Sequence, residues 1–251
     1  MKIAVCLKRV PDTAAKIRVA ADGKSIDETD LQFVISPYDE YAVEEGIRLK
    51  ERFGEASVTV ITLGPDAAQQ NIRQALAMGA DNGILIQTPP GASFDPYQTA
   101  RNLAATLKER GDDLILFGRQ SVDDQSGQVG PMTARLLGMP CVSEVTKLDI
   151  EDGRARIERE VEGGREILEA SLPLAVGAQK GLNEPRYASL KGIMAAKKKP
   201  IEVVPAEEVE RRLDIVSLDP PPGRPEGRIV GEGVEAVTEL VRLLREEAKA
   251  I

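Results

Sequence analysis

The sequence predicts a three-layer α/β domain with a mainly parallel, twisted sheet, antiparallel additions and an extended C-terminal arm. Three observations carry this prediction. Short apolar runs alternate with helical periodicities from the start of the chain to about residue 118. After about residue 140, turn-separated strands replace that alternation, and from about residue 200 Pro, Gly and charged residues dominate. Alternating strands and helices favour a parallel sheet covered by helices on both faces.

Four apolar runs have the composition of strands that are buried on both faces. Branched side chains dominate them and few polar residues interrupt them, which is typical of parallel sheets. The predicted strands are Lys2 to Leu7, Ser57 to Leu63, Ile84 to Ile86 and Leu114 to Gly118.

Three helices are predicted between these strands. Each begins at a residue that favours a helix N-terminus and ends near a glycine, and apolar side chains recur at helical spacing in the first and third. Their predicted limits are Ser36 to Gly54, Asp66 to Gly79 and Asp95 to Gly111.

The second half of the chain has the pattern of an antiparallel addition followed by an arm. Gly-containing turns separate four further strand candidates, Val142 to Ile150, Arg154 to Val161, Glu166 to Leu172 and Leu174 to Ala178. An amphipathic helix is predicted from Val234 to Leu244. We therefore expect an α/β domain over residues 1–199, including the segment 183–199, and an arm over residues 200–251. The arm either embraces another chain or folds back on its own domain.

Composition excludes several classes of function. Acidic residues outnumber basic ones, 41 to 33, and the net charge of -8 disfavours nucleic acid as a partner. The chain has no histidine, which removes Ser-His-Asp and Cys-His catalysis and imidazole metal sites. No apolar run is long enough for a membrane span, and no signal peptide precedes the first strand. Cys6 and Cys141 are interpreted as buried thiols, so a cytoplasmic location is expected.

The segment 183–199 is a candidate docking loop. It places the apolar side chains of Tyr187, Leu190, Ile193 and Met194 among proline, glycine and lysines, and exposed apolar patches mark partner surfaces. Lys197, Lys198 and Lys199 follow them. The alternative is a short amphipathic core helix with a solvated lysine tail.

The segment from Gly118 to Ala134 is the richest candidate for a ligand site. It follows a buried strand and leads into a helix, where free backbone N–H groups and the helix dipole favour a phosphate. It matches neither a P-loop nor a G-x-G-x-x-G pattern, so an ordinary strand-to-helix loop is the alternative. Asp123 and Asp124 favour caps or ribose hydrogen bonds over acid-base or metal chemistry.

Two other loops are expected at the same edge of the sheet. Cys6, the segment from Ser36 to Asp39, and Leu63 come at or after the ends of predicted strands or at the start of the following helix. Three converging loops at a switch point form a nucleotide pocket. None of these residues forms a nucleophile with a base, so a binding site without hydrolytic chemistry is predicted.

Taken together, these motifs resemble the β-subunit of electron transfer flavoproteins over nearly the whole chain. The similar segments are Lys8 to Asp12, Ser36 to Glu45, Ala75 to Asp81, Gly118 to Ala134, Ile157 to Pro173 and Asn183 to Tyr187 with the lysine run. The resemblance implies a Rossmann-like, adenine-nucleotide-binding domain and an electron carrier rather than an enzyme. It also implies a heterodimer whose α-subunit carries most contacts to FAD, while this chain holds a buried AMP.

The resemblance also implies site residues and partners. AMP would contact Cys6, Ser36, Pro37, Tyr38, Asp39, Leu63, Asp123, Asp124, Gln125, Ser126, Gly127, Gln128, Val129, Gly130, Pro131, Met132, Thr133 and Ala134. Tyr38 would also lie near the flavin ring. Leu190, flanked by Ile193 and Met194, would enter a pocket on an acyl-CoA dehydrogenase or related flavoenzyme, and the lysines would steer it there. Electrons would continue to a quinone reductase.

Two positions depart from the family pattern. Ser36 stands where Asn is usual, and Thr13 replaces an aromatic residue found in some relatives. Two other functions stay open at this point. One is a bifurcating flavoprotein that binds a second FAD in place of AMP and oxidises NADH. The other is a stand-alone nucleotide-binding regulator of the stress-protein kind.

Overall fold

The computed structural model describes residues 1–223 and 226–251. These residues form two compact units. The larger unit comprises Met1–Ile17 and Asp27–Val216, and the smaller comprises Arg18–Ile26 and Ser217–Ile251. Residues 224 and 225 belong to the predicted arm and lie outside the described residues.

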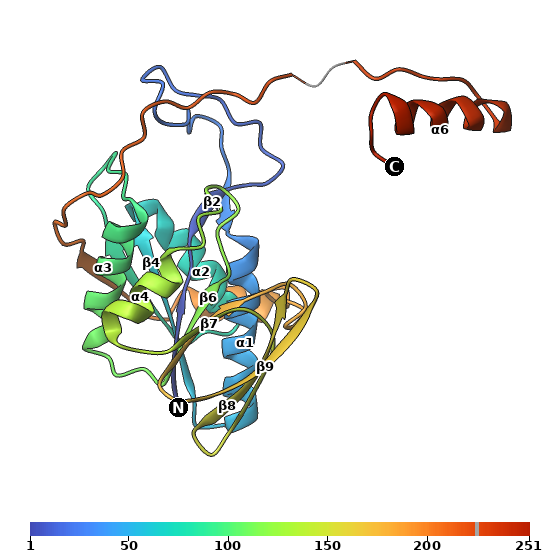
Figure 1. Cartoon of the computed structure of the whole chain (residues 1–251). Coiled ribbons are helices and arrows are strands. Elements are labelled where there is room, and N and C mark those ends of the chain that lie inside the picture. Colours follow the sequence, from blue (N-terminus) through green and yellow to red (C-terminus); the bar gives the residue numbers. More distant parts are fainter. Residues whose placement is uncertain (224–225) are drawn as a thin grey trace. The chain divides into compact units, whose positions relative to one another are not determined.

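A nine-stranded sheet forms the centre of the larger unit (Figure 1). Its strand order is β11-β5-β4-β1-β6-β10-β7-β8-β9. All pairs from β11 through β7 are parallel, and only the pairs β7·β8 and β8·β9 are antiparallel. The predicted α/β class with a mainly parallel sheet is thus confirmed. The strands are β1 (Lys2–Cys6), β4 (Ser57–Gly64), β5 (Asn82–Gln87), β6 (Leu114–Gly118), β7 (Cys141–Glu151), β8 (Arg154–Val161), β9 (Gly164–Ser171), β10 (Leu174–Ala178) and β11 (Ile201–Pro205).

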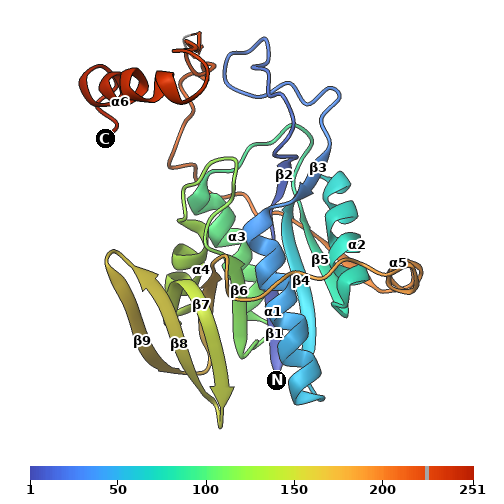
Figure 2. The same cartoon turned by 90° about the vertical axis from the view of Figure 1, so that its right-hand side faces the viewer.

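Helices cover both faces of this sheet, as Figures 1 and 2 show. One face packs against α1 (Pro37–Phe53) and α2 (Gln69–Met78), the other against α3 (Pro96–Lys108) and α4 (Val129–Leu137). Strand β1 shows why both faces need helices. Its side chains alternate between two cores, with Ile3 and Val5 in the first and Ala4 and Cys6 in the second. The short helix α5 (Leu190–Ala196) lies beside α2.

The helix starts differ in how they are capped. Asp95 accepts a hydrogen bond from the backbone of Gln98, whose side chain bonds back to Asp95, and this capping box begins α3. Ser36 precedes α1 as predicted, but its hydroxyl makes no capping hydrogen bond. A short 3-10 turn, η1 (Asp66–Ala68), precedes α2.

Two strands differ from the sequence-based assignment. Strand β10, expected among the antiparallel additions, lies between β6 and β7 and is parallel to both. Its five residues are all buried, which is the signature of a central parallel strand. Strand β11, in the segment predicted as an arm, pairs in parallel with β5 at the sheet edge. A separate two-stranded ribbon joins β2 (Arg9–Pro11) and β3 (Phe33–Ile35).

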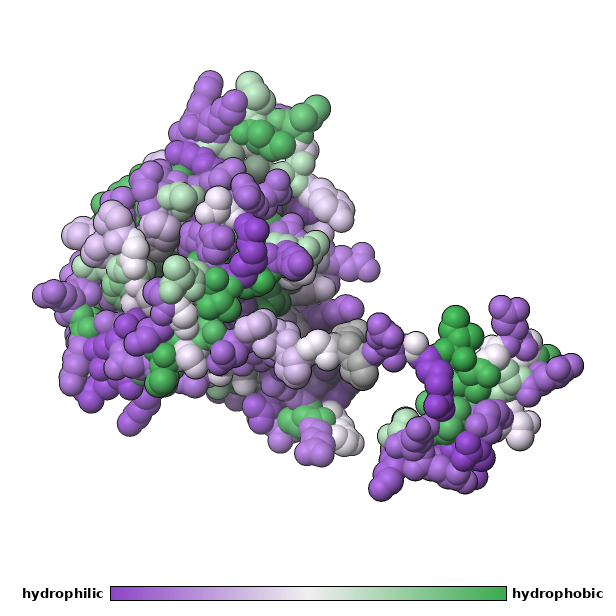
Figure 3. Space-filling view, turned by 90° about the horizontal axis from the view of Figure 1, so that it is seen from above, coloured by the Kyte–Doolittle hydropathy of each residue, from purple (hydrophilic) through white to green (hydrophobic). Residues whose placement is uncertain are grey.

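The smaller unit contains the predicted amphipathic helix. It comprises η2 (Val234–Ala236), α6 (Val237–Glu246) and a bridge between Val19 and Ile26. Hydrophobic surface gathers on this C-terminal segment among charged side chains (Figure 3), and its exposed apolar residues include Val234, Val237, Leu240 and Val241. The predicted boundary at residue 200 stays a prediction. Among the described helices, none is both long and apolar enough to cross a bilayer.

Candidate functional site

A cavity of about 270 Å³ opens at the carboxyl edge of the parallel sheet. The chain runs from β1 to β4 and β5 on one side, then crosses to β6 on the other side of β1. The gap between β1 and β6 is therefore the topological switch point, where open α/β sheets bind ligands. The segments that follow β1, β4, β5 and β6 all contribute to its wall.

Half of the predicted cofactor-binding residues line this cavity. They are Cys6, Asp39, Leu63, Asp124, Ser126, Gly127, Gln128, Val129 and Gly130. The other predicted residues are not part of its wall: Ser36, Pro37, Tyr38, Asp123, Gln125, Pro131, Met132, Thr133 and Ala134. Whether either set contacts a ligand stays a prediction.

Sequence reasoning missed one whole wall of the cavity. Residues between β5 and the first turn of α3 contribute Thr88, Ala92, Phe94, Pro96 and Thr99. The signal was present, because this segment follows a parallel strand whose carboxyl end must meet the same edge. Lys8, Phe117 and Arg119 also line the cavity.

The buried carboxylate of Asp39 joins two of the cavity-forming segments. It accepts hydrogen bonds from the backbone amides of Lys8, at 2.7 Å, and Gly118, at 2.9 Å. Burial raises its pKa to about 7, although both backbone donors and the Lys8 charge act in the opposite direction. Asp39 therefore fixes the ends of β1 and β6 relative to α1.

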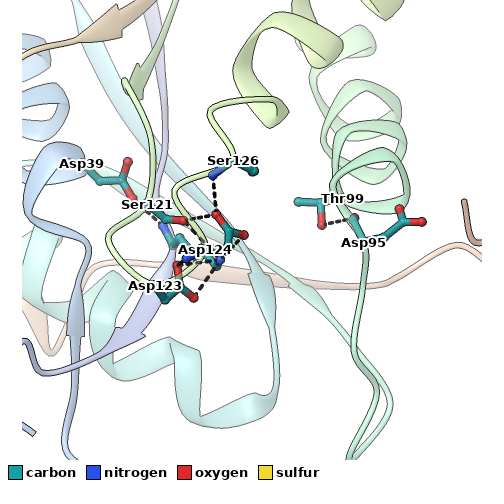
Figure 4. Close-up of polar contacts among 8 residues, drawn as sticks. Asp39, Asp95, Thr99, Ser121, Asp123, Asp124 and Ser126 are labelled. Atoms are coloured by element: carbon teal, nitrogen blue, oxygen red, sulfur yellow. Dashed lines mark hydrogen bonds and ion pairs between the residues drawn. The ribbon is translucent and has the colours of Figure 1, made fainter. Parts of the chain in front are cut away.

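Lys8 holds the loop after β6 in place. Its ammonium lies 2.8 Å from Asp123 and 2.9 Å from Asp124. Asp124 also accepts from the hydroxyl of Ser121 and from the backbone of Ser126 (Figure 4). Burial raises the pKa of Asp124, but the bonds from Ser126 and Lys8 outweigh this and lower it to about 2. These contacts hold the acidic pair within the loop, and its contact with a ribose stays a prediction.

The N-terminus of α4 faces the cavity without a side-chain cap. Gln128 is the N-cap, it makes no side-chain capping bond, and Gln128, Val129 and Gly130 line the cavity. Backbone N–H groups in such a first turn attract anions, and the helix dipole adds to the attraction. Gly130 lies against the Phe117 ring, because a Cβ added at Gly130 would stand only 3.3 Å from Cγ of that ring. This arrangement can hold a phosphate.

The site offers a cavity for binding rather than an activated nucleophile. Cys6 contributes a thiol to the cavity wall. Burial raises the pKa of that thiol well above its ordinary value, and the charge of Asp39 raises it further. A thiol with a raised pKa stays protonated at neutral pH and is inert. Among the described residues, no cluster of three or more His, Cys, Asp or Glu is arranged to hold a metal ion.

The predicted docking loop is exposed at the side of α2. Tyr187 is fully exposed, Leu190 is 84% exposed and Met194 is 64% exposed, while Ile193 is 44% exposed. These fractions count against the alternative of a core helix. Of the three lysines, Lys197 and Lys198 are exposed and Lys199 is partly buried.

Arg186 fixes the N-terminal root of this loop to α1. Its guanidinium donates to both carboxylate oxygens of Glu44, at 2.8 and 3.0 Å, and to both of Glu51. Asn183 adds bonds to the Tyr41 carbonyl and to Glu45. Bidentate pairs of this kind stabilise the contact and also fix the relative orientation of the two side chains.

The fold and the position of the cavity are those of the class of α/β proteins that bind ligands at the switch point of a parallel sheet. Residues 24–209 match the family model described as electron transfer flavoprotein domain. The chain is 44% identical to the electron transfer flavoprotein subunit beta of Bacillus subtilis, covering all of both chains. It is 40% identical to the human protein of the same name, over 98% of this chain and 97% of the relative.

A relative from Syntrophomonas wolfei with the same name is also 40% identical, over 99% of this chain and 98% of its own length. Likeness at this level over nearly the full length of both chains shows the family. The chain belongs to the electron transfer flavoprotein β-subunit family.

Proposed function

We propose that this chain is the β-subunit of a heterodimeric electron carrier, that it holds one AMP in the cavity, and that it encloses an FAD bound mainly by an α-subunit. The observation that carries the nucleotide assignment is the cavity between β1 and β6, with the uncapped α4 N-terminus in its wall. The full-length relatives named as β-subunits support the heterodimer.

The chemistry of the cavity suits AMP. The first turn of α4 offers N–H groups for the phosphate, and the apolar side chains of Phe94, Leu103 and Phe117 offer contacts for the adenine ring. The Ser36 hydroxyl is buried and has no hydrogen-bond partner among the described residues, but Ser36 does not line the cavity, so its proposed contact with AMP rests on the family resemblance. When bound, FAD supplies the one-electron and two-electron chemistry, and this chain contributes Tyr38, whose ring lies under Arg119 at 5.6 Å.

Helix α5 carries the docking function in this proposal. Leu190 is the apolar residue that enters a pocket on an acyl-CoA dehydrogenase or related flavoenzyme, with Ile193 and Met194 beside it. Electrons then pass through the FAD to a quinone reductase. The exposed apolar face of α6 supplies a contact for the α-subunit. The cysteines are free, which suits the reducing cytoplasm.

The test is to co-express the chain with its α-subunit, denature the purified complex, and identify and count the released nucleotides. One FAD and one AMP per heterodimer is the expected result. Two FAD and no AMP would identify a bifurcating enzyme, and a stable flavin-free homodimer would identify a nucleotide-binding regulator. Within the complex, Gln128→Ala should reduce bound AMP more than bound FAD, because Gln128 lines the cavity.

A further inference from the structure

Helix α5 is too short to be stable by itself. It has seven residues, fewer than the roughly 12 that an isolated helix needs to be even marginally stable in water. Leu190 and Met194 are largely exposed and Ile193 is 44% exposed, so burial of that face contributes little to holding the helix. Contacts elsewhere must therefore keep it folded.

The backbone of α5 lies directly on the C-terminal turn of α2. A Cβ on Gly192 would stand 2.3 Å from the carbonyl oxygen of Ala77, which is a severe overlap. Ala196, at the other end of α5, is 3% exposed and belongs to the main core. Only glycine at position 192 permits this close approach.

Two cations tie the ends of the two helices together in opposite directions. Arg73, from α2, donates through Nη1 to the carbonyl oxygens of Ala196, at 2.6 Å, and Lys199, at 2.5 Å. Lys199 Nζ in turn donates to the carbonyl oxygens of Leu76, at 2.9 Å, and Ala80, at 2.5 Å. Arg73 thus satisfies the last carbonyl of α5 and one just beyond it, while Lys199, three residues after α5, satisfies one in the last turn of α2 and one just beyond that helix. Positive charge at these C-terminal ends is favoured by the helix dipole.

We infer that Arg73, Gly192 and Lys199, the α5 anchors, are positioning residues that hold Leu190 ready to enter the apolar pocket of the dehydrogenase. The inference rests on the proposed docking function. A preformed helix avoids the ordering cost that a mobile segment pays on binding. Lys199 therefore differs in role from Lys197 and Lys198, which are exposed and available for long-range attraction.

The expected effect follows from the population of the folded helix. If loss of one anchor leaves α5 formed about a tenth of the time, the apparent dissociation constant for the dehydrogenase rises about tenfold. None of the three anchors lines the cavity proposed for AMP, and none is among the residues proposed near the flavin, so nucleotide occupancy and the flavin potential should not change.

The experiment uses the complete heterodimer with Arg73→Ala, Lys199→Ala and Gly192→Ala. Arg101→Ala and Lys108→Ala, which remove exposed cations from α3, are the matched controls. Reduction of the carrier by an acyl-CoA dehydrogenase and its acyl-CoA substrate gives KM and kcat for the carrier. Hydrogen exchange of residues 190–196 reports the order of α5 without any partner, and FAD content, AMP content and flavin potential report the rest of the molecule.

We expect faster exchange in α5 and a KM about tenfold higher for each anchor variant, with kcat, nucleotide content and potential unchanged. Arg73→Lys, which keeps a cation beside the same carbonyls, should recover part of the loss. Unchanged exchange in Arg73→Ala and Lys199→Ala overturns the inference, as does faster exchange with an unchanged KM. If the wild-type complex accepts no electrons from the dehydrogenase, the proposed function fails. In that case the docking role fails with it, while the exchange rates still show whether these residues order α5.

Discussion

The carboxylate of Asp39 accepts a 2.9 Å hydrogen bond from the backbone amide of Gly118, which lies 79 positions away in the chain. The bond joins the first turn of α1 to the end of β6, one of the two strands that flank the switch point. Because the carboxylate is buried, this contact couples the geometry of the candidate nucleotide site to a single titrating group.

Asp39→Asn should flatten the dependence of stability on pH. The pKa of Asp39 is about 7 in the folded chain against an ordinary value of 3.8. Between these values the folded chain keeps a proton that the unfolded chain has lost. Stability therefore falls as pH rises through this window, by at most about 1.4 kcal/mol per pH unit from this group. Urea unfolding of both chains at pH 5, 6 and 7 measures the two slopes, and equal slopes would contradict the prediction.

Gly118→Ala should damage the same junction sterically. The added Cβ would stand 2.5 Å from Asp39 Oδ1 and 2.7 Å from the carbonyl carbon of Tyr38, so backbone must move. We expect the free energy of unfolding to fall by about 1–3 kcal/mol, with loss of bound nucleotide. Gly164→Ala is the control, because no atom lies within 4 Å of its Cβ position. Thermal unfolding and nucleotide content measure both effects, and equal behaviour of the two variants would refute the clash.

Arg186→Ala should loosen the root of the docking loop. Removing the guanidinium leaves the carboxylate of Glu44, whose side chain is only 5% exposed, without its bidentate partner. Such a loss costs about 1–3 kcal/mol. Glu51→Gln, at a carboxylate whose side chain is 55% exposed, should cost much less. Chemical denaturation of the two variants compares these costs, and similar destabilisation by both would show that burial of Glu44 does not matter.

Leu190→Ala should weaken electron delivery without affecting folding. The side chain is 84% exposed, so the folded chain loses little packing. A central apolar residue of an interface contributes about 2 kcal/mol, which corresponds to a KM roughly thirtyfold higher. Ile167→Ala, at an exposed residue of β9, is the control. Steady-state reduction by an acyl-CoA dehydrogenase measures the KM, and an unchanged value would remove Leu190 from the docking surface.

The local pattern of the sequence determined most of the elements. Short branched runs predicted β1, β4, β5 and β6, and the N-cap residues with their following prolines predicted the starts of α1 and α3. These features depend on side-chain periodicity and on backbone preferences within a few residues, so they can be read without knowledge of the fold. The motifs at the strand ends also predicted the correct edge of the sheet for the cavity.

Contacts between distant residues decided the rest. The insertion of β10 between β6 and β7, and the addition of β11 beside β5, depend on pairing with strands far away in the sequence. Lys8 meets its carboxylate partners across more than a hundred residues, and so do Arg73 and the carbonyls that it binds. Local periodicity contains no information on such pairs, because only the closing of the sheet and the packing of helices on it bring them within bonding distance.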